Sequence, residues 1–180
     1  MERNVALIAL FAALIALLGL VPKIDLLSGV PITAQSMGVM LAGTVLGAKR
    51  GFLAAALLLV LVAIGLPLLA GGRGGLGVFV GPTAGFAIGF PFAAFATGWL
   101  MERWKAPVGI AAFVSSLFGG VVVLYAMGIV GMSLVLGKTL PEAALLSTPF
   151  LIGDTIKAAL TGLITSQLAR LRPGVVLSRS

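Results

Sequence analysis

The stretch Pro149-Phe-Leu-Ile-Gly-Asp154-Thr-Ile-Lys157 brings two opposite charges into a run of apolar residues, 150–168, that otherwise has the composition of a membrane-spanning helix. Residues three positions apart lie on one face of a helix, so Asp154 and Lys157 can touch. A charge at mid-bilayer costs roughly 2.5–3.5 kcal/mol on insertion scales, whereas a helical ion pair returns only about 0.2–0.5 kcal/mol. We therefore expect further polar partners around this pair.

The depth of the pair in the membrane separates two interpretations. If the span opens at Pro149, Asp154 lies only about 7 Å inside it at 1.5 Å of rise per residue. The first interpretation is an interfacial ion pair in which Lys157 extends toward water. The second is a polar binding pocket that opens to one face of the membrane, and the polar residues described below favour it.

Composition restricts the class of protein. Of 180 residues, 60% are hydrophobic and 9% are charged, which is typical of an integral membrane protein. The chain has no Cys and no His, so thiol catalysis, disulfides, His–Cys metal sites and a Ser–His dyad are excluded. The net charge of +7 lies at the ends of the apolar segments, and we do not expect nucleic-acid binding.

Six apolar segments predict an all-α membrane bundle of six transmembrane helices, in a single domain that covers residues 1–180. The expected spans are 5–20, 32–46, 52–69, 82–101, 108–136 and 150–168. In the connector before the last span, Thr139 and Glu142 have the spacing of a helix capping box around Pro141.

Six spans put both termini on one side of the membrane, and the basic residues indicate which side. Eight of them lie on the side of the termini: Arg3, Lys49, Arg50, Arg103, Lys105, Arg170, Arg172 and Arg179. The opposite side has only Lys23, Arg73 and Lys138. The positive-inside rule then predicts that both termini are cytoplasmic. The starts of the second and sixth spans and the loop around Arg73 would face outward.

Polar residues from distant parts of the chain therefore share the predicted outer mouth: Gln35, Arg73, Thr83, Asp154 and Lys157. The glycine-rich loop 70–81 is either simply flexible or folds over a ligand, with Arg73 offering two parallel donors to a carboxylate. This loop contains a GxGxxG motif, but it connects two predicted membrane helices, whereas a nucleotide-binding motif of this kind connects a strand and a helix. We therefore do not expect a nucleotide there. No GxxxxGK[ST] motif occurs, so active transport would need a partner or an ion gradient.

Four motifs in this order resemble the biotin-specific substrate-capture (S) component of energy-coupling-factor (ECF) vitamin transporters, the BioY family. They are Val30-Pro-Ile-Thr33-Ala-Gln35, Gly65-Leu-Pro67 with Gly71-Gly-Arg73-Gly-Gly-Leu-Gly77, Gly81-Pro82-Thr83, and Gly153-Asp154-x-x-Lys157-Ala. The resemblance extends from about residue 9 to 168. It implies a six-helix S-component fold in a bacterial or archaeal cytoplasmic membrane, which binds biotin from outside and needs no cofactor.

The resemblance also implies partners and residue roles. The partners are a transmembrane coupling subunit and two ABC-type ATPases; whether the chain depends on them stays open. The family's alanine signature for docking fits either Ala9-x-x-x-Ala13 or Ala12-x-x-x-Ala16. Asp154 would accept from the ureido N–H groups of biotin, and Lys157 would donate to the ureido oxygen or the tail carboxylate. The remaining expected contacts are Arg73 with the carboxylate, Gln35 and Thr83 with unpaired polar atoms, and Phe79 or Phe86 with the rings.

Four other functions are weighed against biotin capture. An S component for another small carboxylated vitamin would have the same architecture. A membrane-embedded hydrolase would need a Ser–Lys dyad, and no Ser neighbours Lys157 in sequence. A headgroup transferase would need several carboxylates for a metal, whereas the chain has five acids, four of them outside the spans. A pore would need polar residues along its full length, but the inner halves of the spans are almost all aliphatic. We therefore expect a binding protein and not an enzyme.

Overall fold

The computed structural model of the chain describes residues 2–22 and 33–179. Three expectations from the sequence lie outside these residues: the start of the second span at Ile32, the position of Lys23, and the first three residues of the motif Val30–Gln35.

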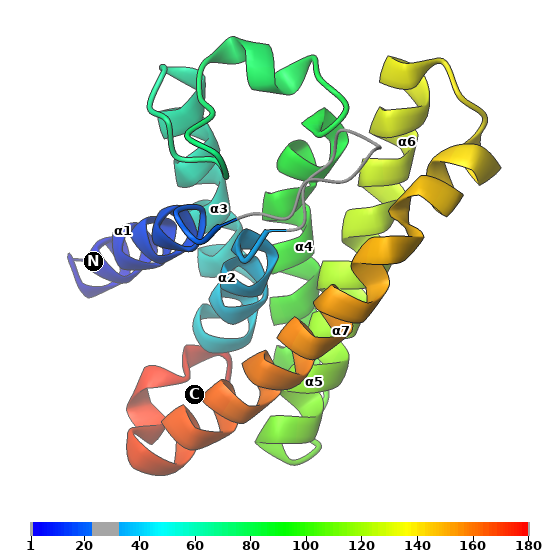
Figure 1. The fold of residues 1–180 in the computed structure, drawn as a ribbon. Coiled ribbons are helices and arrows are strands. Elements are labelled where there is room, and N and C mark those ends of the chain that lie inside the picture. The colour runs from blue at the N-terminus through cyan, green and yellow to red at the C-terminus, as the bar shows by residue number, and fades with distance from the viewer. Residues whose placement is uncertain (1, 23–32, 180) are drawn as a thin grey trace.

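Helices make up most of the described chain (Figure 1). The α-helices are α1 (Glu2–Leu18), α2 (Gln35–Leu41), α3 (Ala48–Ala63), α4 (Ala84–Arg103), α5 (Val108–Leu117), α6 (Leu124–Leu136) and α7 (Leu140–Leu171). A π-helical turn, Ala42–Leu46, continues α2, and another, Phe118–Val123, joins α5 to α6 into one rod. Short 3-10 turns lie at Leu76–Phe79, Pro173–Val175 and Leu177–Arg179. Counted with their π-helical continuations, these helices form the six rods that the sequence predicted.

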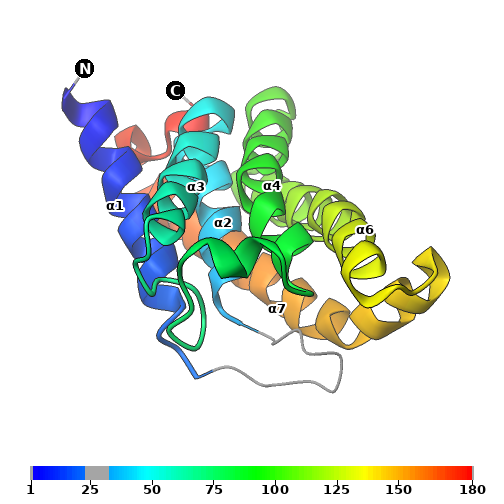
Figure 2. The same cartoon turned by 90° about the horizontal axis from the view of Figure 1, so that it is seen from above.

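Helix α4 lies at the centre of the bundle and packs against α2, α3, α5 and α6. Figures 1 and 2 show α7 crossing the bundle diagonally, and it packs against α5, α6 and α2. Glycines allow the closest helix approaches. A Cβ atom on Gly131 of α6 would lie 2.6 Å from the Cα of Gly85 in α4, so any larger residue would push these two helices apart.

Three of the helical rods are long and apolar enough, taken alone, to cross a bilayer: Ala84–Arg103, Val108–Leu136 and Leu140–Leu171. Helices α1 and α3 have 17 and 16 residues, at the lower limit for a span, and Gln35–Leu46 is shorter still. The chain is nevertheless a multi-pass membrane protein, because these shorter apolar helices pack into the same bundle as the three long ones.

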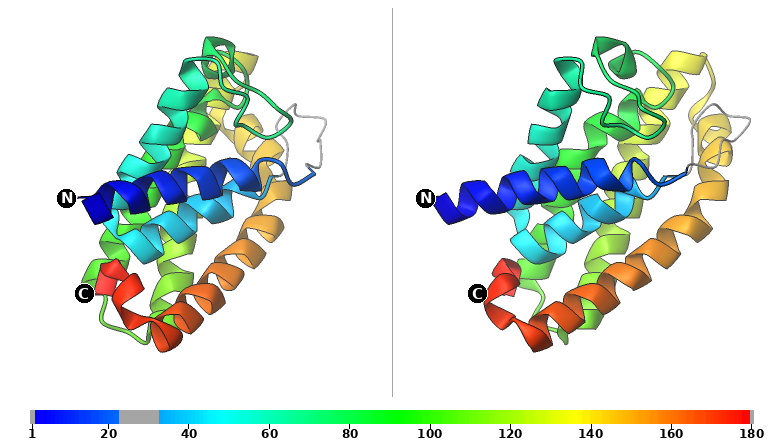
Figure 3. Two further views of the ribbon diagram at one scale, coloured as in Figure 1. Left: turned by 90° about the vertical axis from the view of Figure 1, so that its left-hand side faces the viewer. Right: turned by 60° about the vertical axis from the view of Figure 1, so that its left-hand side comes forward.

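The two termini and two of the helix connections meet at one end of the molecule (Figure 3). Arg3 donates to the carbonyl of Gly174 at 2.9 Å, which ties the start of α1 to the chain after α7. Arg179 donates to the carbonyl of Ala106 at 3.2 Å, and Glu102 accepts from the Ala48 N–H at 2.8 Å. Both ends of the chain therefore lie at the same end of the bundle.

Two of the predicted span boundaries were wrong. The third span was expected to continue to residue 69, but α3 ends at Ala63, and the chain turns at Gly65, whose φ of 108° favours glycine. The apolar residues that follow belong to a loop that folds back into the protein, where Leu69 is buried and exchanges both backbone hydrogen bonds with Arg73. Apolar content alone could not distinguish this inward loop from another turn of helix.

The sixth span was expected to open at Pro149, but α7 begins at Leu140 and continues through the proline. The Glu142 carboxylate accepts from the backbone N–H of Thr139 at 2.8 Å, so the predicted capping box marks the start of α7 itself. Asp154 consequently lies about 21 Å along α7 at 1.5 Å per residue, close to the middle of this helix. The depth of 7 Å assumed a helix start at Pro149, which α7 does not have.

Candidate functional site

A cavity with an empty volume of about 600 Å³, counted out to its open mouth, lies between α2, α4, α6, α7 and the loop that follows α3. Its lining residues are Thr33, Gln35, Ser36, Leu69, Arg73, Thr83, Phe86, Ala87, Phe90, Leu124, Phe150, Asp154 and Lys157. All five polar residues expected at the outer mouth are therefore brought to one cavity.

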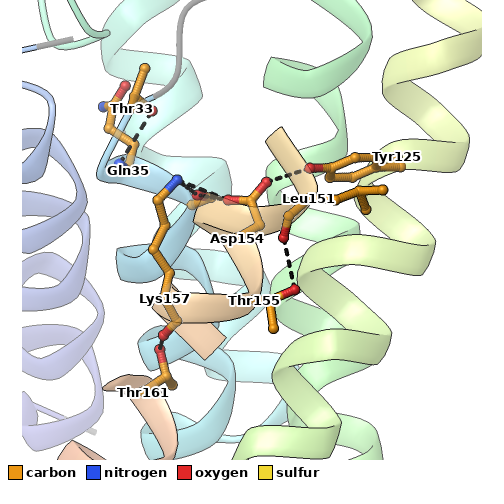
Figure 4. A network of polar contacts seen from close by, with 9 residues as sticks. Thr33, Gln35, Tyr125, Leu151, Asp154, Thr155, Lys157 and Thr161 are labelled. Atoms are coloured by element: carbon orange, nitrogen blue, oxygen red, sulfur yellow. Dashed lines mark hydrogen bonds and ion pairs between the residues drawn. The ribbon is translucent and has the colours of Figure 1, made fainter. Parts of the chain in front are cut away.

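Asp154 is the centre of the polar network at this cavity (Figure 4). Its Oδ1 accepts from the hydroxyl of Ser36 at 2.9 Å and from Nζ of Lys157 at 2.8 Å, and its Oδ2 accepts from the hydroxyl of Tyr125 at 2.7 Å. Lys157 also donates to Ser36 Oγ at 3.1 Å. Helices α2, α6 and α7 each supply part of this network. The polar partners that the buried charges required are therefore Ser36 and Tyr125.

Hydrogen-bond capacity remains in this network for a ligand. A carboxylate offers about four lone-pair positions and an ammonium three N–H donors. Within the described residues, Asp154 accepts three hydrogen bonds and Lys157 Nζ donates two. One acceptor position on Oδ2 and one N–H of Lys157 are left. A ligand that offers one donor next to one acceptor would complete both groups.

The contact between Ser36 and Lys157 was not predictable from sequence neighbours, and it bears on the hydrolase alternative. In a Ser–Lys dyad the lysine accepts the serine proton. Here Lys157 donates to Ser36, and the Ser36 hydroxyl donates to Asp154. The Ser36 proton therefore points to the Asp154 carboxylate, which also accepts hydrogen bonds from Lys157 and Tyr125. Because Lys157 does not accept the Ser36 proton, this arrangement does not activate Ser36 as a nucleophile.

The side chain of Gln35 is used to hold the backbone around the cavity. Its amide nitrogen donates to the carbonyls of Ile15 at 3.2 Å and Leu68 at 3.0 Å, and its oxygen accepts from the N–H of Ala70 at 2.9 Å. One buried amide thus joins α1, α2 and the loop after α3. Although it lines the cavity, Gln35 has little capacity left for a ligand.

Arg73 and Thr83 form the polar part of the mouth. Arg73 is half-buried; its Nε donates to the carbonyl of Ala70 at 3.1 Å, and its Nη1 donates to the Thr83 hydroxyl at 3.0 Å. Among the residues that the structure describes, none accepts a hydrogen bond from Nη2. The guanidinium is thus held in place by its neighbours while part of its donor edge stays available.

Aromatic rings form much of the apolar wall. Phe86 packs edge-on against Tyr125, with ring centroids 5.9 Å apart, and contacts Phe150 at 6.2 Å. Phe79, the other expected ring contact, is absent from the described lining and packs in the 3-10 turn Leu76–Phe79 against the hydrophobic core. Of the two expected phenylalanines, only Phe86 lines the cavity.

Comparison with known proteins establishes the family. The model of the BioY family matches residues 2–174. The chain belongs to the BioY family. The biotin transporter BioY of Rhodobacter capsulatus is 55% identical to it, covering 99% of this chain and 100% of that protein. The biotin transporter BioY of Rhizobium etli is 50% identical, covering 90% of each.

A solved structure supports the same assignment at the level of the fold. The crystal structure of the S-component for biotin from an ECF-type ABC transporter superposes with a TM-score of 0.88, covering 94% of this chain and 92% of that one at 32% identity. The S-component fold that the sequence predicted is therefore confirmed for this BioY-family chain, which is a transporter component and not an enzyme.

Sequence reasoning missed Ser36 and Tyr125 as members of the site. Ser36 follows directly after Gln35 and lies three residues after Thr33, so its position among polar residues could have identified it. Tyr125 is the one Tyr of the chain, in a long apolar span. A buried tyrosine usually has a partner for its hydroxyl, but the sequence does not indicate that the partner is Asp154.

The structure also distinguishes the two possible alanine pairs of this BioY-family chain. Ala12 is buried in the bundle and Ala16 is half-buried, whereas Ala9 and Ala13 are exposed on the outer face of α1. Of the two pairs, only Ala9 and Ala13 have both members exposed.

Proposed function

We propose that this chain captures biotin at the outer face of the membrane and is the substrate-specificity S component of an ATP-driven ECF transporter. The observation that carries the proposal is the Asp154–Lys157 pair, held at the cavity by Ser36 and Tyr125, with unused hydrogen-bond capacity on both charges. The relatives named as biotin transporters and the solved S-component for biotin support the choice of ligand.

The chemistry of biotin fits the two polar ends of the cavity. Its ureido group offers N–H donors next to a carbonyl, which match the free acceptor position on Asp154 and the free N–H of Lys157. Because only one acceptor position is left, Asp154 takes one ureido N–H while Lys157 donates to the ureido oxygen. The apolar bicycle then lies against Phe86 and Phe150, and the tail extends toward Arg73 at the mouth.

The carboxylate of the tail binds Arg73 in this proposal. The available edge of the guanidinium supplies a charge-assisted hydrogen bond, and Thr83 keeps the guanidinium in position. Gln35 acts on the ligand indirectly, because its amide holds the loop that carries Arg73.

The orientation and the partners follow from the same proposal. The excess of basic residues at the end shared by the termini favours a cytoplasmic position for both termini in a bacterial or archaeal cytoplasmic membrane, and the cavity then opens outward. The exposed Ala9 and Ala13 on α1 are the docking surface for the transmembrane coupling subunit, which works with two ABC-type ATPases. Dependence on these partners is part of the proposal.

Equilibrium titration of the detergent-purified chain tests this function. Biotin should bind at one site per chain, and a large excess of thiamine or riboflavin should not compete, because neither has the ureido ring. Desthiobiotin, which keeps the ureido group and the tail, should compete. No binding of biotin to folded protein, or tighter binding of another carboxylated vitamin, would overturn the assignment.

A further inference from the structure

A second concave surface lies on the outside of the bundle, between the first turns of α3 and the middle of α4. This groove has an empty volume of about 780 Å³, counted out to its open side, and is lined by Lys49, Phe52, Leu53, Phe92 and Phe95. Phe92 and Phe95 are 48% and 42% exposed, so these rings do not belong to the core. The biotin cavity uses Phe86 and Phe90 of α4, and the two sites share no lining residue.

The groove is preformed by ring packing. Phe52 of α3 meets Phe92 edge-on, with centroids 5.7 Å apart, and meets Phe95 in the same way at 6.5 Å. Helices α3 and α4 lie side by side along it (Figure 2), and they approach closely where a Cβ on Gly98 would lie 2.3 Å from the Ala48 backbone nitrogen. Rigid rings on two closely packed helices give a groove whose shape suits an alkyl chain.

One end of the groove is basic. Lys49 is exposed, and its aliphatic stem lines the groove while its charge can reach the membrane surface. On α4, Phe95, Trp99 and Arg103 follow at four-residue spacing and lie on one face. The Arg103 guanidinium lies 4.7 Å above the Trp99 ring. Tryptophans gather at the headgroup level of membranes, so Trp99 marks the level at which Lys49 and Arg103 meet the lipid headgroups.

Negative charge is scarce at this end. Glu102 is the acidic residue nearest along the chain to Arg103, and its carboxylate accepts from the Ala48 N–H. Arg50 and Lys105 add further positive charge at the same two helix ends. An apolar groove that ends in basic side chains complements a molecule with an alkyl chain and an anionic head.

We propose that this groove binds an anionic phospholipid of the surrounding bilayer. One acyl chain lies along Phe52, Phe92 and Phe95, and the phosphate and charged headgroup bind Lys49, with Arg103 as a second cation. The site is separate from the biotin cavity, so the proposal does not depend on the identity of the transported ligand.

Native mass spectrometry of the detergent-purified chain tests the proposal. Phosphatidylglycerol and phosphatidylcholine with identical acyl chains are titrated in parallel, so that only the headgroup differs, anionic in the first lipid and zwitterionic in the second. Phosphatidylglycerol should bind about fivefold more tightly, and Lys49→Gln should remove most of this preference. The matched control is Arg172→Gln, which removes an exposed charge after α7 and leaves the groove intact. Biotin affinity should be the same in all three proteins.

A second arm tests the apolar part of the site. Phe92→Ala should weaken the binding of both lipids by a similar factor, because it shortens the surface for the acyl chain and leaves the charge unchanged. Equal binding of the two lipids to the unmodified chain would overturn the proposal, as would equal losses in Lys49→Gln and Arg172→Gln. A lipid-free dimer that dissociates in Phe92→Ala would show that a second copy of the chain covers the groove. This result would also overturn the proposal.

Discussion

The hydroxyl of Tyr125 donates to Oδ2 of Asp154 at 2.7 Å, joining α6 to α7 beside the proposed biotin cavity (Figure 4). Both side chains are buried, at 7% and 5% exposure. A buried carboxylate needs its hydrogen bonds, since those to charged groups contribute about 1.5–3 kcal/mol each. Tyr125 therefore determines where the lone pairs of Asp154 point, although it is not expected to be a primary ligand contact.

Tyr125→Phe should weaken biotin binding about five- to tenfold. The ring remains, so the edge contact with Phe86 at 5.9 Å is kept, but the carboxylate loses the donor that orients Oδ2. Isothermal titration of the variant measures the loss, and thermal unfolding in the same detergent provides the control for folding. Unchanged or tighter binding would mean that Asp154 is oriented by Ser36 and Lys157 alone.

Asp154→Asn should reduce the affinity for biotin by about 10- to 100-fold or more. The change replaces an acceptor oxygen with an N–H group, so a ligand N–H would face another donor, and unsatisfied buried donors cost about 1–3 kcal/mol. Lys157→Met, which keeps the apolar stem, should cost at least as much because it leaves Asp154 without its counter-ion. An ion pair with no role in binding would leave both affinities at the level of the unmodified chain.

Much of the fold was predictable because the apolar segments are long and the basic residues are asymmetric. The rod from Val108 to Leu136 matches its predicted bounds. The error at Pro149 arose because a proline was taken as a helix start, although prolines are tolerated inside membrane helices. The capping box at Thr139 and Glu142 was the better start signal, since it satisfies backbone donors that a proline cannot.

The site was predictable in its charged members and in Gln35, Thr83 and Phe86, but not in Ser36 and Tyr125. Asp154, Lys157 and Arg73 are conspicuous because charges in or next to apolar segments are costly and need a reason. Tyr125 and Ser36 are inconspicuous in the sequence. Their roles depend on which face of each helix is turned toward the cavity. The hydrophobic pattern does not determine that face in a bundle where most helix faces are apolar. Phe79 was expected in the cavity but lies elsewhere, because the loop that carries it forms a 3-10 turn that packs this ring against the core.

Gln35→Glu should loosen the loop over the cavity. A carboxylate still accepts from the Ala70 N–H, but it places an oxygen against the carbonyls of Ile15 and Leu68, which the amide nitrogen now binds. We expect faster amide hydrogen exchange in residues 64–75 and faster biotin dissociation. Exchange in α5 serves as the internal reference. If residues 64–75 stay as protected as before, Gln35 does not anchor the loop.

Cysteine labelling tests the orientation, because the chain has no native Cys. Lys138→Cys, in the exposed turn before α7, should react with an impermeant maleimide in intact cells, and Arg172→Cys, exposed after α7, should react only after lysis. Ser178 is unsuitable as the inner probe, since its hydroxyl is buried and donates to the carbonyl of Thr44. The reverse labelling pattern would mean that the cavity opens toward the cytoplasm and that the proposed orientation is wrong.

The contact between Arg73 and the biotin carboxylate can be isolated by changing both partners. Biotin amide keeps the bicycle and the tail but has no charge. For the unmodified chain we expect about tenfold weaker binding of the amide than of biotin, because the guanidinium loses a charge-assisted hydrogen bond. In Arg73→Met the two ligands should bind with nearly equal affinity, since the cation that distinguishes them is gone.

Arg73→Lys separates charge from geometry in the same experiment. Lysine keeps the positive charge but lacks the planar guanidinium with which Arg73 can bind both the Thr83 hydroxyl and the ligand. The preference for biotin over the amide should therefore shrink to about threefold. Asp154→Asn is the matched control, because it weakens both ligands by the same factor through the ureido group. If Arg73→Met kept the full tenfold preference, the carboxylate would bind elsewhere, and among the described lining residues Lys157, with its one free N–H, would be the remaining cation.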